Sequence, residues 1–177
     1  MWFFAVEFAA MALTVVQIAL LPRLFFPFSD ICLPIAAITL SVLRDRPLTA
    51  ALWALTAGFL LDLYGLLGFG TETAALFAAF LLQRYVFMRF LTNASAAAVF
   101  LLTAVGLIAR FAFRLGIDGL DVLAGGIPVL LGSETSAWTG LAAAIVANGA
   151  LVLTVRGAAA LAIRRYQRAF LSHLAPR

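Results

Sequence analysis

The sequence has almost none of the residues on which most enzyme and metal sites depend. Its 177 residues include one cysteine, Cys32, one histidine, His173, and no lysine. A single cysteine excludes a disulfide within the chain, and a single histidine in the C-terminal tail excludes zinc clusters and histidine-assisted nucleophiles. Gly68-Phe-Gly70 is not a phosphate loop, because no Lys-Ser or Lys-Thr follows it. We therefore expect no catalytic residues, no metal site, no cofactor and no enzymatic activity.

Charged residues are also scarce, at 11% of the chain, whereas soluble domains carry about 25%. Hydrophobic residues make up 65%, and the mean hydropathy is +1.11. Apolar stretches occupy the whole length, and no long polar segment separates them. The sequence therefore predicts one polytopic membrane domain over residues 1–177, of the all-α integral membrane class.

The apolar stretches are separated by short turns that contain proline, glycine or charged residues. We expect about six transmembrane helices in a compact bundle, at about residues 2–21, 28–43, 48–64, 71–91, 96–115 and 137–163. The segment 116–136 is rich in glycine and contains Pro128, which favours an outer loop over a regular spanning helix. Whether this loop re-enters the membrane stays open.

The distribution of arginine predicts the orientation of these helices. With six crossings both termini lie on one side, and that side collects Arg44, Arg46, Arg84, Arg89, Arg164, Arg165, Arg168 and Arg177. The opposite side has Arg23 and Arg114. Because basic residues concentrate on the cytoplasmic side, both termini should face the cytoplasm. Orientation in the membrane also explains the net charge of +4, so we expect no nucleic-acid partner.

Ionisable residues within the apolar stretches fall at two depths. Asp62, Tyr64, Glu72, Arg110 and Arg114 lie at the outer ends of their helices and form a candidate outer polar cluster. A charge at the centre of a membrane helix costs roughly 2.5 to 3.5 kcal/mol on insertion scales, so such residues need a reason to be there. Either each reaches water at the interface, or opposite charges on neighbouring helices pair.

At the inner depth, Glu7 on the first helix and Arg156 on the last are a candidate pair. The alternative is again that each side chain reaches water independently of the other.

Small residues form stripes along two of the predicted helices. Ala54 and Gly58 share one face of helix 48–64 with Asp62, and Gly140, Ala144 and Asn148 share one face of helix 137–163. Such stripes let helix backbones approach closely in lipid. We expect these seams to pack within the protein; alternatively, a helix of a partner protein binds there, with Asn148 as a hydrogen-bond donor.

Residues 22 to 93 resemble the bacterial rod-shape-determining membrane protein family MreD. The resemblance is carried by Pro27-Phe-Ser-Asp30-Ile-Cys-Leu-Pro34, by the Gly58-x3-Asp62 helix end, and by the glycine-rich corner Gly68-Phe-Gly70-Thr. It implies a non-catalytic, multi-pass scaffold of the bacterial inner membrane that serves the cell-elongation machinery, the elongasome, in rod shape and peptidoglycan synthesis. The implied partners are MreC, the actin-like MreB and the peptidoglycan synthase pair.

A second class looks similar in hydropathy, the substrate-binding S components of energy-coupling-factor vitamin transporters. These subunits also have six helices in under 200 residues, and the resemblance to MreD implies the same bundle. An S component carries a polar outer pocket for its vitamin. The outer polar cluster of this chain is enough for a small pocket and too small to name a ligand. The alternative function is therefore vitamin binding for an ATPase-driven transporter, which would require a small-molecule ligand.

Overall fold

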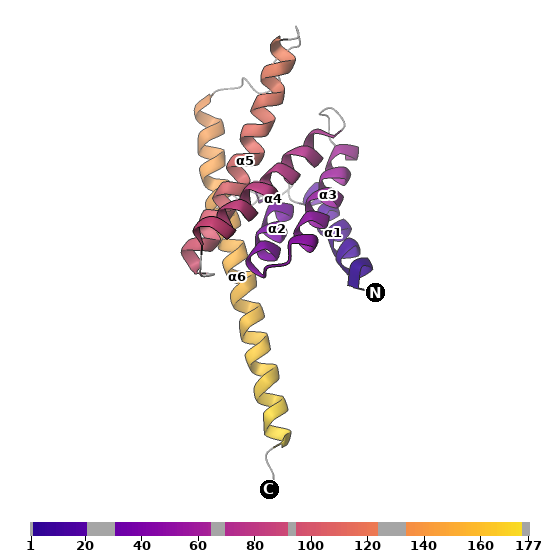
Figure 1. Ribbon diagram of the computed structural model, residues 1–177, viewed down its shortest axis with the longest axis vertical. Coiled ribbons are helices and arrows are strands. Elements are labelled where there is room, and N and C mark those ends of the chain that lie inside the picture. The colour runs from indigo at the N-terminus through magenta and orange to yellow at the C-terminus, as the bar shows by residue number, and fades with distance from the viewer. Residues whose placement is uncertain (1, 21–30, 65–69, 92–94, 124–133, 175–177) are drawn as a thin grey trace.

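In the computed structural model the chain forms a bundle of α-helices (Figure 1). The structure describes residues 2–20, 31–64, 70–91, 95–123 and 134–174, and within these ranges there are six helices and no strand. The helices are α1 (Trp2–Ala19), α2 (Leu33–Leu43), α3 (Pro47–Tyr64), α4 (Thr71–Phe90), α5 (Ala96–Leu123) and α6 (Glu134–Leu174). The all-helical class is as predicted, and the ends of α1, α3 and α4 lie within two residues of the predicted ones.

The predicted start of the second helix, at residue 28, is wrong. Residues 28–30 lie outside the described part of the chain, but Ile31 and Cys32 are not helical, and Cys32 has an extended backbone at φ −108° and ψ 90°. Pro34 explains the late start. It has no N–H to donate and fixes φ near the helical value, which suits the first turn of a helix and not its interior.

The predicted outer loop 116–136 is wrong at both ends. α5 continues to Leu123, and α6 begins at Glu134, which leaves 124–133 outside the described residues. Glycine within a helix costs only about 1 kcal/mol relative to alanine, so Gly116 weakens α5 without ending it. α6 also runs eleven residues past its predicted end at 163, because the sequence from there to Leu174 contains neither proline nor glycine.

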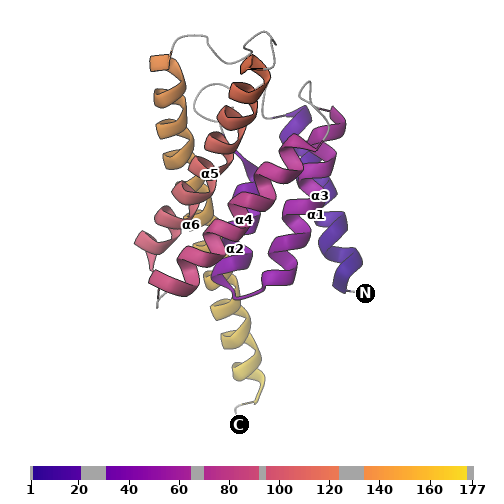
Figure 2. The ribbon, with the colours of Figure 1, turned by 45° about the horizontal axis from the view of Figure 1, so that its top comes forward.

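α2 is the centre of the bundle. It has only 11 residues and contacts all five other helices. Figure 2 shows α4 crossing obliquely in front of it. Most of its residues are buried, on every side of the helix: Pro34, Ile35, Ala36, Ile38, Thr39, Ser41 and Val42. An apolar helix can be covered by lipid or by protein, and the apolar side chains of α2 are covered by the five neighbouring helices.

Three helices are long and apolar enough to cross a membrane: α3 in full, Ala96–Ile117 of α5 and Trp138–Ala162 of α6. α2 is too short, and the described apolar part of α1, Glu7–Ala19, is shorter than a span. α4 is interrupted by polar side chains. Large apolar side chains cover the outside of the bundle, among them Phe8, Leu63, Met88, Leu101 and Val146. This exterior and the three candidate spans indicate a membrane protein.

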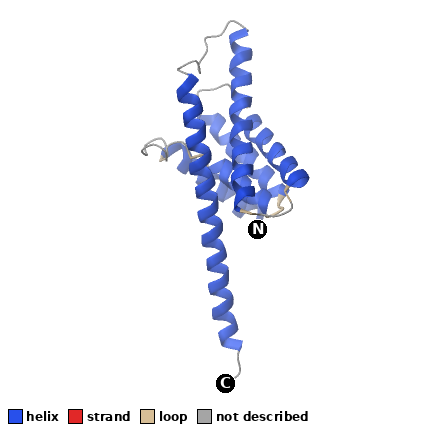
Figure 3. Cartoon of the chain, turned by 90° about the vertical axis from the view of Figure 1, so that its left-hand side faces the viewer, coloured by secondary structure: helices blue, strands red, loops and turns tan. Residues whose placement is uncertain are grey.

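The start of α1 and the end of α6 lie toward the same end of the bundle (Figure 1). α6 then continues far past the other helices, as the side view shows (Figure 3). Its 41 residues rise about 62 Å at 1.5 Å per residue, roughly twice the hydrocarbon thickness of a bilayer. The opposite end of the bundle, where α3 ends and α4 begins, is called the Asp62 end below.

Candidate functional site: a polar cluster beside a cavity

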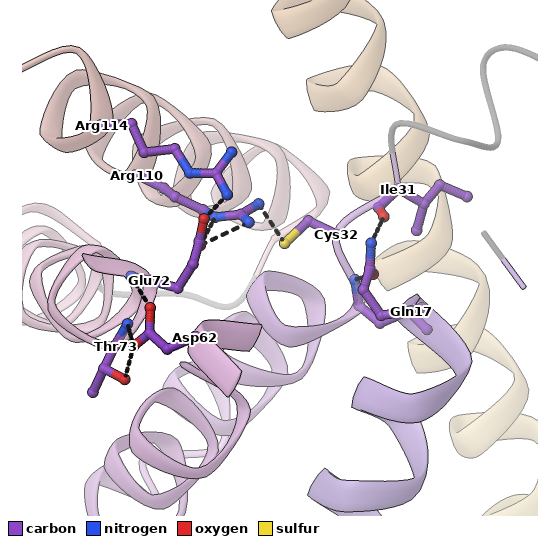
Figure 4. Close-up of polar contacts among 9 residues, drawn as sticks. Gln17, Ile31, Cys32, Asp62, Glu72, Thr73, Arg110 and Arg114 are labelled. Atoms are coloured by element: carbon purple, nitrogen blue, oxygen red, sulfur yellow. Dashed lines mark hydrogen bonds and ion pairs between the residues drawn. The ribbon is translucent and has the colours of Figure 1, made fainter. Parts of the chain in front are cut away.

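Asp62, in the last turn of α3, holds the start of α4. Its carboxylate accepts hydrogen bonds from the backbone N–H groups of Glu72 at 2.7 Å and Thr73 at 3.0 Å, and from the Thr73 hydroxyl at 2.5 Å (Figure 4). The residue at the N-cap position of α4 is Gly70, at φ 94°, which has no side chain to cap the helix. A carboxylate from the preceding helix therefore satisfies the exposed N–H groups of α4.

A glycine one turn before Asp62 makes this contact possible. A Cβ on Gly58 would lie 2.5 Å from the Cα of Thr73, far inside van der Waals contact with backbone. The backbones of α3 and α4 thus touch at Gly58. Because positions four apart share a helix face, Asp62 points at the same turn of α4.

Glu72 lies on the other side of this turn, and its side chain is 4% exposed. Its carboxylate pairs with two arginines of α5. Arg110 donates from Nε at 3.1 Å and from Nη2 at 2.9 Å to Oε2, and Arg114 Nη2 pairs with Oε1. Arg110 also donates from Nη1 to the sulfur of Cys32 at 3.2 Å (Figure 4). Arg110 therefore links α5 to α4 and to Cys32, the residue before α2. The opposite charges of Glu72 and the two arginines compensate each other, whereas each would be costly to bury alone.

The start of α2 is held by amide side chains from two further helices. Gln17 of α1 donates to the Ile31 carbonyl at 2.9 Å and accepts from the Leu33 N–H at 2.8 Å. Asn148 of α6 accepts from the Cys32 N–H at 2.8 Å. Non-helical backbone inside an apolar bundle needs such partners, because neither lipid nor apolar side chains can supply them.

A cavity of about 260 Å³ lies beside Arg110, between the start of α2, α5 and α6. The described residues that line it are Cys32, Leu107, Arg110, Phe111, Arg114, Gly140, Leu141 and Ala144. The charged groups among them are the two guanidinium groups, and the rest of the wall is apolar apart from the thiol. The cavity is thus small, lined by cations and placed at the Asp62 end.

The structure brings together four of the five residues of the predicted outer polar cluster, Asp62, Glu72, Arg110 and Arg114. Asp62 and Glu72 are buried at 6% and 3% exposure, so neither reaches independently for water. Glu72 pairs with the arginines of α5, as the pairing alternative expected, whereas the partners of Asp62 are the N–H groups at the start of α4 and the Thr73 hydroxyl. Tyr64 is not part of the cluster: it is 69% exposed on the outside of the bundle. Two residues after Asp62, it lies about 200° round the helix and faces away from α4.

The structure does not bring Glu7 and Arg156 together. In the described parts of α1 and α6 no packing contact joins the two helices, and both side chains are partly exposed. The sequence matched their depths in the membrane, but depth alone does not tell which helices are neighbours. The interpretation that each side chain acts alone fits better.

The two stripes of small residues lie mainly inside the protein, as expected. Ala54 and Gly58 are buried, Gly58 against Thr73, and Asn148 is fully buried where it binds Cys32. Ala144 and Gly140 line the cavity. A Cβ on Gly140 would meet no atom within 4 Å, so this end of the stripe faces open space.

A second polar contact, not anticipated from the sequence, lies in the middle of the bundle. Gln83 of α4 is fully buried and donates from Nε2 to the Thr39 hydroxyl and to the Leu102 carbonyl, both at 2.9 Å. Gly106 lies against it, where a Cβ would collide with the amide. Gln83, Gln17 and Cys32 are isolated polar or small residues in apolar stretches, and that isolation was the only signal for them.

No model of a known protein family matches this chain, and neither does any curated protein sequence or solved structure. Within the described residues, no group of three or more histidine, cysteine, aspartate or glutamate side chains could hold a metal ion. The functional reading therefore depends on the residues themselves.

Proposed function

We propose that this chain is a scaffold protein of the bacterial inner membrane, of the MreD type, that serves the cell-elongation machinery and binds an MreC-like partner. The observation that carries the proposal is the joint between α3 and α4. Gly58, Asp62 and Gly70 are among the residues that carry the resemblance to MreD, and here they make one structural device. Gly58 sets the approach of the helices, Asp62 caps α4, and Gly70 supplies the left-handed corner.

The proposal includes six membrane crossings with both termini in the cytoplasm. The start of α1 and the end of α6 lie toward one end of the bundle, which fits an even number of crossings (Figure 1). The helices that are too short or too polar to span alone are supported by neighbours, since α2 touches every other helix and the polar start of α4 is paired with α3 and α5. Arg44 and Arg89 lie at the end of the bundle where α1 begins and α6 ends, and such arginines favour a cytoplasmic location for that end.

The proposal also holds that the chain performs no chemistry of its own. The polar groups at the Asp62 end serve structure: Asp62 is used as a helix cap, and Glu72 and Arg110 are bound to each other. The exposed apolar faces of the bundle and the projecting part of α6 are surfaces on which membrane and cytoplasmic partners could bind (Figure 3).

Co-purification tests the proposal. The chain, tagged at its C-terminus, is co-expressed in a rod-shaped bacterium with the MreC of its own source and extracted in mild detergent. We expect MreC in a stoichiometric complex, and an unrelated single-span protein at the same expression level should be lost on washing. Depletion of the chain should turn rods into spheres, and re-expression should restore them. A normal cell shape after depletion, together with no MreC recovery, would overturn the proposal.

One alternative is an S component that binds a vitamin for an energy-coupling-factor transporter. The presence of a polar cavity speaks for this alternative, and the small volume of the cavity speaks against it. The cavity volume of about 260 Å³ is below the roughly 300 to 1,000 Å³ typical of pockets for drug-sized ligands, so a vitamin would have to enlarge it. Mass spectrometry of the purified protein distinguishes the two functions. A stoichiometric bound vitamin supports the alternative, and an empty protein that retains MreC supports the scaffold.

A further inference from the structure

We propose that the cavity between α5 and α6 is a binding site for an anionic group of the phosphate or carboxylate class, held by Arg110 and Arg114. This inference goes beyond the scaffold function and does not depend on it. It needs only that α5 and α6 cross a membrane, for which both are long and apolar enough.

The first argument is the chemistry of the wall. Arg110 and Arg114 are four residues apart on α5, so their side chains lie on one face of the helix, and both line the cavity. No carboxylate is among the described residues that line it. Planar guanidinium groups with several N–H donors match the paired oxygens of phosphates and carboxylates. Both guanidinium groups share the single carboxylate of Glu72, so these three side chains keep a net positive charge, which favours an anion in the cavity.

The second argument is preorganisation. The guanidinium of Arg110 is held by the carboxylate of Glu72 and by the sulfur of Cys32, and the Arg110 side chain is 18% exposed. Those contacts use three of the five N–H donors of an arginine, which leaves donors for a ligand. Binding therefore does not have to order a flexible side chain, which is one of the usual costs of binding.

The third argument is the depth of the cavity. Trp138, at the start of the membrane-crossing part of α6, is 61% exposed and packs edge-on against Phe111, with ring centroids 5.7 Å apart. Exposed tryptophans of this kind gather at the level of the lipid headgroups. Gly140 and Ala144 follow it on α6 and line the cavity about 3 to 9 Å deeper, at 1.5 Å per residue. A lipid phosphodiester beside the bundle lies close to this level.

The fourth argument is size. A cavity of about 260 Å³ accommodates a phosphate group with part of its headgroup, whereas drug-sized ligands occupy roughly 300 to 1,000 Å³. The shared chemistry is thus one anionic group next to an apolar wall formed by residues such as Leu107 and Leu141. Its source is either an anionic lipid or a free anion such as inorganic phosphate.

Native mass spectrometry of the purified full chain tests the proposal and separates the sources. The protein is exchanged into detergent and titrated with phosphatidylglycerol, with diacylglycerol, which has the same acyl chains but no phosphate, and with phosphatidylglycerol in the presence of millimolar inorganic phosphate. We expect one phosphatidylglycerol to bind about tenfold more tightly than diacylglycerol, as charge-assisted hydrogen bonds imply. Displacement by inorganic phosphate assigns a free anion to the site, and resistance to displacement assigns the lipid. Equal binding of both lipids overturns the proposal.

Two glycine variants make the test specific for the cavity. Gly140→Leu introduces a side chain that grows into the cavity from α6, and Gly116→Leu is the matched control on α5, which has the same open surroundings but does not line the cavity. We expect phosphatidylglycerol binding to weaken about tenfold in G140L and in R114Q and to stay unchanged in G116L. R114Q keeps the test decisive if G140L does not fold. Binding that survives in a folded G140L or in R114Q overturns the proposal, whether or not MreC binds.

Discussion

Asp62 and Thr73 are joined by two hydrogen bonds, because the Asp62 carboxylate accepts both the backbone N–H and the hydroxyl of Thr73. Side-chain contacts thereby fix the end of α3 to the start of α4. On the opposite side of the same turn, Glu72 carries the link on to α5. One turn of α4 thus holds three helices in place.

Replacing Asp62 should lower the stability of the protein. Asp62→Ala leaves the N–H groups of Glu72 and Thr73 without their acceptor, and each buried N–H left unpaired costs about 1 to 3 kcal/mol. Asp62→Asn keeps one acceptor oxygen and should lie between alanine and wild type. Thermal unfolding in detergent, followed by the loss of the monodisperse chromatographic peak, measures the change. Asp45→Asn is the control and should have little effect, because the Asp45 side chain is 78% exposed beside Arg84 and asparagine also tolerates its left-handed backbone at φ 50°.

Gly58 and Gly140 should respond in opposite ways to the same small substitution. Gly58→Ala pushes a methyl group against the backbone of α4, so α3 and α4 have to move apart at a cost of about 1 to 3 kcal/mol. Gly140→Ala meets open space and replaces a poor helix former by the best one, so it should be neutral or slightly stabilising. The same unfolding assay compares them. Equal stability of the two variants would contradict the close approach at Gly58.

The buried pair of Glu72 and Arg110 should behave as a unit. Glu72→Gln leaves both Arg110 and Arg114 without their carboxylate, and breaking a buried pair typically costs about 3 to 5 kcal/mol. Arg110→Gln leaves Glu72 paired with Arg114, so its cost should be smaller. The double variant should be more stable than the sum of the single effects predicts, with a coupling of about 0.5 to 3 kcal/mol in a double-mutant cycle. Additive effects in that cycle would show that the two side chains do not interact.

The only cysteine of the chain reports on the charge of the cavity. Cys32 is buried at 3% exposure but lines the cavity beside Arg110 and Arg114. An anionic methanethiosulfonate reagent should modify it several-fold faster than a cationic one of similar size, since two arginines raise the local concentration of anions. Intact-protein mass spectrometry measures both rates. Arg114→Gln should reduce the preference, and a faster reaction with the cationic reagent would contradict a cationic cavity.

Much of this architecture could be predicted from the sequence, because apolar stretches and their polar interruptions determine helices and depths. The depths of Asp62, Glu72 and Arg110 along their helices predicted a common level, and the structure brings them together. Depth did not suffice for Glu7 and Arg156, because it contains no information on which helices are neighbours.

Other features depend on tertiary contacts that no local pattern encodes. Asp62 caps a helix other than its own, and Asn148 binds the backbone before α2 from a position 116 residues later. The continuation of α5 through Gly116 shows the same limit, since a local preference of about 1 kcal/mol is easily overridden by the rest of a long helix.

The shortness of α2 has a consequence for the biogenesis of the protein. Eleven residues rise about 16 Å, roughly half the hydrocarbon thickness of a bilayer, so α2 cannot rest in lipid as an independent segment. Four of the helices that enclose it are synthesised after it. We therefore expect the nascent chain to keep α2 at the insertion machinery or at the membrane surface until those helices arrive. The second helix to leave the ribosome would then be among the last to reach its final place.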